Sequence, residues 1–106
     1  MNNDEYVSFL TSVLIKIENA INLMDQKPPK HIPAYHKVLG IQQKLAGLPD
    51  EYRNKLFSQL IRVRGIINYL TNGHYEKAHI QIINLKRDLV EICLEIKNEK
   101  DTVKKI

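Results

Sequence analysis

Four histidines are the side chains in this sequence best suited to metal or acid–base chemistry. They form two pairs, His31 with His36 and His74 with His79, and the members of each pair are five residues apart. Five steps along an α-helix rotate a side chain by about 140°, so the members of a pair do not share a helix face. A zinc site needs converging ligands at closer spacing, with cysteine or carboxylate neighbours. We therefore predict no metal site.

Nucleophilic residues are few and lack the context that activates them. Cys93 is the single cysteine, and it lies beside an apolar stripe where a small buried thiol is the ordinary occupant. It would act as a nucleophile only beside a histidine in space. Ser8, Ser12 and Ser58 have no nucleophile-elbow motif, and the chain has no glycine-rich phosphate loop. We predict no catalytic residue, no cofactor and no enzymatic activity.

Basic residues are concentrated between positions 26 and 64. This stretch has eight Lys or Arg residues and two acids, a net charge of +6, whereas the rest of the chain carries −2. One outward sector of a predicted helix in this stretch combines arginines with apolar residues, a composition typical of interaction surfaces. The predicted partner-binding residues are Arg53, Phe57, Ile61, Arg62 and Arg64.

We expect this sector to contact a protein partner within a larger assembly. The same arginines would suit RNA phosphates, so a basic RNA-binding or ribosome-associated protein is the first alternative. No DNA sequence readout is predicted. A small regulator or immunity-type protein that contacts a membrane-bound target is the second alternative.

The composition is that of one globular domain spanning residues 1–106. With 43% hydrophobic and 26% charged residues and a net charge of +4, the chain has room for one core. The acidic start does not resemble a secretory signal, and one cysteine cannot form an internal disulfide. Lys16 and Glu18 interrupt the first apolar stretch. We therefore expect a cytoplasmic protein without membrane association.

Apolar residues recur at steps of three and four along four segments, which predicts four helices. Asn2 or Asn3 caps the first helix, which ends at Pro28-Pro29, and Pro33 and Gly47 bound the second. The third runs from Pro49 to Asn72-Gly73, and the fourth begins at Tyr75. The predicted inner residues are Tyr6, Leu10, Val13, Ile17, Ala20, Ile21 and Met24; Tyr35, Val38, Leu39, Gln42 and Leu45; Tyr52, Leu56, Leu60, Val63, Ile67 and Leu70; and Tyr75, Ala78, Ile82, Leu85, Leu89, Ile92 and Ile96.

The last helix also has a second apolar row at helical spacing, completed by Arg87. The row consists of Ile80, Ile83, Val90 and Leu94. We expect it to be buried inside the bundle, because the first helix is also apolar around much of its circumference. The alternative is that the row forms a contact between copies of the chain.

The junction Tyr69-x-x-x-Gly73-x-Tyr75-x-x-Ala78 resembles the centre of a tetratricopeptide helical hairpin. Only Tyr35 coincides 34 residues earlier, which excludes a repeat array. Residues 35–96 are also similar to the helical domain shared by steroid receptor RNA activator proteins and the carboxy terminus of the COPII outer-coat subunit. That family tends to have an isoleucine-histidine pair after the alanine and a tryptophan in its last helix, which this chain lacks. The resemblance implies an interaction module without catalytic residues.

The expected fold is therefore all-α, a single antiparallel bundle of four helices. A break at Gly65, inside the third helix, would make five. The expected function is docking onto a larger protein assembly.

Overall fold

The computed structural model describes the backbone of residues 1–105 and the side chains of residues 1–99. Five helices occupy nearly all of this part of the chain, and it contains no strand. They are α1 (Asn3–Met24), α2 (His31–Ala46), α3 (Asp50–Lys55), α4 (Phe57–Thr71) and α5 (Tyr75–Lys105). The fold is an all-α helical bundle, as the sequence predicts.

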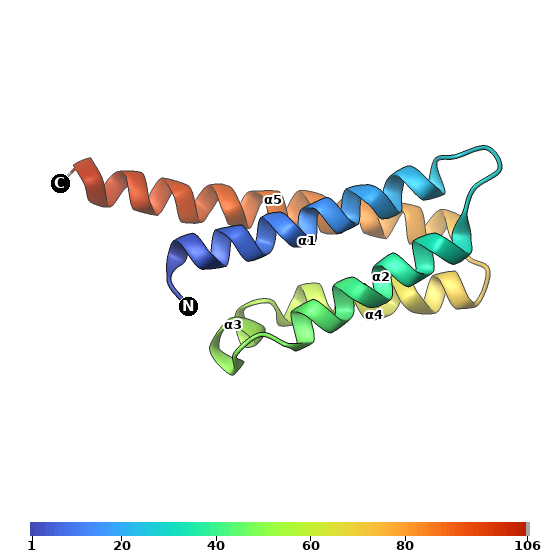
Figure 1. The fold of residues 1–106 in the computed structure, drawn as a ribbon, viewed down its shortest axis with the longest axis horizontal. Helices are drawn as coiled ribbons and strands as arrows, with labels where there is room; N and C mark the ends of the chain where they lie inside the picture. Colours follow the sequence, from blue (N-terminus) through green and yellow to red (C-terminus); the bar gives the residue numbers. More distant parts are fainter. Residues whose placement is uncertain (106) are drawn as a thin grey trace.

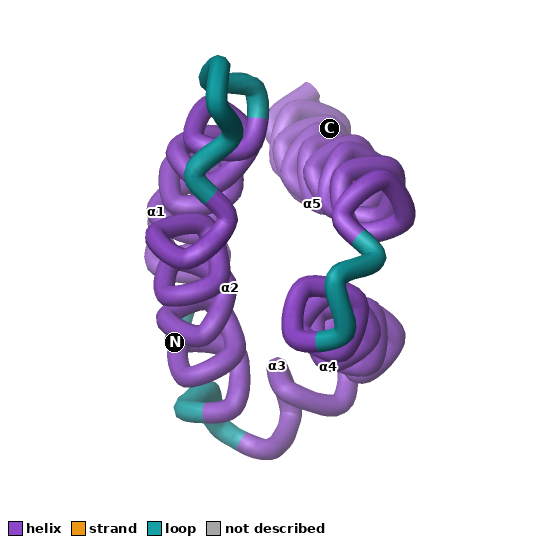
Figure 2. The backbone as a smooth tube through the Cα atoms, turned by 90° about the vertical axis from the view of Figure 1, so that its right-hand side faces the viewer, coloured by secondary structure: helices purple, strands orange, loops and turns teal. Residues whose placement is uncertain are grey.

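The four long helices are arranged as a ring. α1 packs on α2, α2 on α4, α4 on α5, and α5 returns to α1, and each neighbour runs antiparallel to the next (Figure 1). Seen along the bundle, α1 and α2 form one side and α4 and α5 the other (Figure 2). The short helix α3 lies at one end of the bundle (Figure 1). The hydrophobic core lies between the four long helices.

α1 has the boundaries and the buried face that its sequence predicts. Asn2 caps it: the Glu5 backbone N–H donates to Asn2 Oδ1 at 2.8 Å, and the Asn2 backbone N–H donates to the Glu5 carboxylate. All seven predicted inner residues are buried. By length and composition alone α1 is also apolar enough to cross a membrane, but in this fold its apolar stripe contributes to the core of the bundle.

The sharp turn between α4 and α5 is confirmed. Gly73 adopts a φ of 77°, the left-handed conformation that glycine reaches without steric cost. The His74 backbone N–H donates to the Tyr69 carbonyl at 2.8 Å, which closes the end of α4. The next helix therefore folds back along the one before it.

The break in the predicted third helix lies at Leu56 rather than at Gly65. Leu56 has φ −105° and ψ 18°, outside helical geometry, and its side chain is buried in the core. α3, which precedes it, buries none of its residues fully, although the Tyr52 ring packs 4.8 Å from that of Tyr6. The turn at Leu56 directs this side chain into the core and places α3 at the end of the bundle (Figure 1).

Two predicted inner stripes are correct at most positions and wrong at a few. Val38 and Leu45 of α2, Leu56, and Leu60, Val63 and Leu70 of α4 are buried as predicted, whereas Leu39 and Gln42 are only partly buried. In α2 the buried residues include Ala34 and Ile41, and in α4 Ile66 is buried while Ile67 is only partly covered. Tyr35 and Tyr52 likewise pack at the edge of the core. In α5 the predicted stripe is wrong at its two ends. Tyr75 is exposed, and Ile92 and Ile96 are only partly buried, whereas Cys93 is buried.

The expectation that the second row on α5 is buried was wrong. Its four apolar residues, Ile80, Ile83, Val90 and Leu94, are between 37% and 57% exposed. The long helices on which α5 mainly packs are α1 and α4. Nothing within the described chain covers the row.

Candidate functional site

The α4 face consists of Phe57, Ile61 and Arg64, which share one side of that helix. Their spacing of four and three residues places them in line. Phe57 is 55% exposed and Ile61 50% exposed, and Arg64 is also exposed to solvent. Adjacent exposed apolar side chains beside an arginine have the composition of an interaction surface.

Two of the five predicted partner-binding residues are held within the chain. The Arg62 guanidinium forms an ion pair with Asp88 of α5, and both side chains are partly buried. The Arg53 guanidinium pairs with Asp50 and donates to the Ala46 carbonyl at 3.4 Å, at the end of α2. Arg62 therefore joins α4 to α5, and Arg53 is bound where α2 is followed by α3.

A groove lies next to the α4 face, between α4 and α5. It has a volume of about 350 Å³ and is lined by Ser58, Ile61, Arg62, Gly65, Tyr69 and Gln81. A Cβ atom added at Gly65 would meet nothing within 4 Å, so the glycine leaves open space at this point. From the sequence, Gly65 was a candidate position for a helix break. The groove beside it was not predicted, because no pattern along the chain indicates it.

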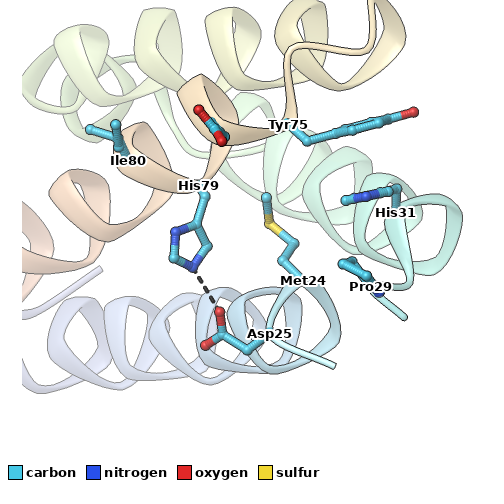
Figure 3. A pocket seen from close by; sticks show the side chains of 8 residues that line it. Met24, Asp25, Pro29, His31, Tyr75, His79 and Ile80 are labelled. Atoms are coloured by element: carbon cyan, nitrogen blue, oxygen red, sulfur yellow. Dashed lines mark hydrogen bonds and ion pairs between the residues drawn. The ribbon is translucent and has the colours of Figure 1, made fainter. Parts of the chain in front are cut away.

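A second hollow, of about 410 Å³, lies where the α1–α2 loop meets the α4–α5 turn (Figure 3). The His31 and Tyr75 rings stack in its wall, 3.6 Å apart and within 3° of parallel. His79 Nε2 lies 2.8 Å from Asp25 Oδ1, which links α5 to the end of α1. His31 and His79 thus meet at one hollow although they belong to different sequence pairs, a relationship that spacing along the chain could not show.

No metal centre is formed among the described residues. No group of three or more His, Cys, Asp or Glu side chains in this part of the chain is arranged to hold an ion. His36 and His74 are exposed, and His36 is not in the wall of the hollow that contains His31.

Cys93 is buried, as its place beside the inner stripe of α5 indicated. Burial raises the pKa of its thiol, and the Lys97 ammonium partly opposes that shift. Burial also raises the pKa of the Tyr6 phenol, with the nearby Cys93 and Tyr52 adding to the effect. A protonated, buried thiol is a poor nucleophile.

Comparison of the chain with protein-family models, with curated proteins and with solved structures gave no match. Its function is therefore inferred from the surfaces described above.

Proposed function

We propose that this chain is a non-enzymatic interaction module that docks onto a larger protein assembly through the α4 face. The observation that carries the proposal is the exposure of Phe57 and Ile61 side by side on α4, with Arg64 beside them. Interfaces are enriched in aromatic residues and arginine at their centres, and a few such side chains supply most of the binding energy.

The partner surface that fits this face is apolar with a carboxylate at its edge. Phe57 and Ile61 supply apolar contact area, and the groove beside Ile61 accepts a side chain from the partner. Arg64 has no ion pair within the described chain, so its guanidinium is free to pair with an Asp or Glu of the partner. The charge pair orients the complex, while the apolar contacts provide most of its affinity.

The basic stretch favours a protein partner over RNA. Four of its eight cations interact within the chain: Lys44 with Ser12, Arg53 with Asp50, Lys55 with Glu51, and Arg62 with Asp88. Fewer cations are then free to contact phosphates, and phosphate contacts supply most of the affinity of a non-specific RNA-binding protein.

Affinity capture from cells that express the protein, with nuclease treatment, tests this function. The variant Phe57→Asp with Ile61→Asp places two carboxylates on the α4 face, and we expect it to lose captured proteins by at least about tenfold. The control is Ile32→Asp, which changes an exposed isoleucine of α2 near the opposite end of α4 and should retain them. Circular dichroism establishes that each variant is folded.

Two results would contradict the proposal. One is capture by the folded double variant of the same proteins in the same amounts as the unmodified chain. The other is loss of all captured material on nuclease treatment, which would indicate an RNA-binding protein instead.

A further inference from the structure

The exposed row of α5 has the spacing of a helix-pairing seam. Ile80, Ile83, Arg87, Val90 and Leu94 follow one another at steps of three, four, three and four residues. This is the heptad spacing by which two helices pack together. At roughly 1.5 Å per residue the row is about 21 Å long, and it faces away from the core over its whole length.

Ile15 of α1 extends this row into a second helix. The ion pairs Glu18–Lys86, at 2.5 Å, and Asp25–His79, at 2.8 Å, set the antiparallel register of α1 against α5. In the same register, Ile15, which is three residues before Glu18, lies level with Leu89, which is three residues after Lys86. Ile15 is 59% exposed, so an apolar side chain of α1 lies level with the middle of the α5 row.

The α5 row borders α1 rather than α4. Lys86 and His79 reach α1 from α5, whereas Asp88 reaches α4. Ile83 and Val90 each follow one of the α1-facing residues by four positions, one helical turn, and therefore lie next to them around the helix. Ile15 and the α5 row consequently belong to one surface, called the α1–α5 face below.

Arg87 lies in the middle of the α5 row, and Glu91, one helical turn further on, lies at its edge. Both are exposed, and neither makes an ion pair within the described chain, although a four-residue spacing would allow them to pair with each other. An arginine in the middle of an apolar seam needs a partner, and a charged residue at such a position specifies the register of helix pairing.

We infer that a second copy of this chain covers the α1–α5 face, with the two α5 helices antiparallel about a two-fold axis midway between Asp88 and Leu89. In that register Ile83 lies opposite Leu94 of the second copy. Arg87 lies opposite Val90 of the second copy and beside its Glu91, and the symmetry repeats the ion pair. The surface is thus complementary to itself at Ile83 with Leu94 and at Arg87 with Glu91, whereas Ile80 lies opposite Lys97 at each end of the contact. The repeated charge pair favours a second copy over an unrelated partner.

Sedimentation equilibrium from about 1 µM to about 1 mM tests this inference. The unmodified chain should approach twice its mass of 12.4 kDa as concentration rises. Ile83→Asp with Leu94→Asp should sediment as a monomer with unchanged circular dichroism. Ile32→Asp, away from the face, should associate like the unmodified chain.

Charge exchange between positions 87 and 91 gives the sharper readout. Arg87→Glu alone and Glu91→Arg alone should each weaken association by about tenfold or more, because like charges then meet twice. A mixture of these two variants should recover association, since positions 87 and 91 then carry opposite charges at both contacts between the copies. Recovery of association on mixing would show that positions 87 and 91 meet between chains. If the substitutions acted only on the α5 helix of each chain, mixing would not restore association.

Three outcomes would overturn the inference. They are a monomer at every concentration, association that the Ile83→Asp, Leu94→Asp variant retains, and a mixture of the charge variants that associates no better than either one alone. Sedimentation of the monomer with anionic vesicles would point to a lipid surface instead. The α4 face takes no part in this pairing, so failure here leaves the proposed function to be tested separately.

Discussion

Arg62 of α4 and Asp88 of α5 form an ion pair across the seam between these helices, 26 residues apart in the chain. Both side chains are partly buried, and the pair lies beside the groove that adjoins the α4 face. The ion pair holds α4 against α5 next to the α4 face. Because Arg62 is paired with Asp88, it is not free to pair with a binding partner.

The Arg62–Asp88 pair should contribute modestly to stability. We expect Arg62→Ala, Asp88→Ala and the double variant to give a coupling free energy of about 0.5–1 kcal/mol, because partly exposed ion pairs are screened by water. Urea unfolding of these variants and the unmodified chain measures it. A coupling indistinguishable from zero would mean that the pair is not formed in solution.

The inner face of α4 can be tested with two neighbouring isoleucines. Ile66→Ala should lower the free energy of unfolding by about 3 kcal/mol, because it leaves a cavity in the core. Ile67 is only partly buried, so Ile67→Ala should cost about 1 kcal/mol. Chemical denaturation compares them, and the reverse order would show that α4 is rotated relative to this structure.

These two isoleucines also show how far the sequence could predict the fold. Ile66 and Ile67 each lie three or four residues from both Val63 and Leu70, so both satisfy the same helical period. Only the positions of α2 and α5 decide which one enters the core. In α1 Val13 and Leu14 have the same relation to Leu10 and Ile17, and there the predicted residue, Val13, is the buried one.

The candidate site was predictable only in part for a related reason. Phe57 and Ile61 are exposed as their helical position indicated, because exposure follows from the stripe on the opposite side of the same helix. The ion pair of Arg62 depends on Asp88, and the meeting of His31 with Tyr75 depends on the packing of distant segments. Hydrophobic periodicity along the chain does not indicate which side chains from distant segments come into contact.

Two glycines should respond to alanine in opposite directions. Gly73→Ala should lower the free energy of unfolding by about 1 kcal/mol, because its φ of 77° strains any side chain. Gly65 lies inside α4 with open space around it, so Gly65→Ala should raise stability by about 0.5–1 kcal/mol. Thermal and urea unfolding measure both, and equal losses at the two positions would disagree with the helix boundaries.

Stability should fall at high pH through Cys93 and Tyr6. Burial raises the pKa of both groups in the folded chain, so the unfolded chain loses these protons first as the pH rises. Their contribution is therefore fully present below the ordinary thiol pKa of 9.0 and is lost as the pH passes through the raised folded values.

Urea midpoints from about pH 7 to about pH 10.5 measure this loss. Cys93→Ala with Tyr6→Phe should flatten the dependence relative to the unmodified chain, whatever other groups titrate. An identical slope in both proteins would show that neither group is linked to folding. In the native state at about pH 7, Cys93 should also react with thiol reagents far more slowly than in urea.

The most direct test of the docking role is photo-crosslinking from the α4 face itself. A photoreactive phenylalanine analogue at position 57 should form covalent adducts with a protein partner in cells, and those adducts should survive nuclease treatment. The same analogue at position 32, also exposed, should not form them. No protein adduct from position 57, or equal adducts from both positions, would contradict docking through Phe57 and Ile61.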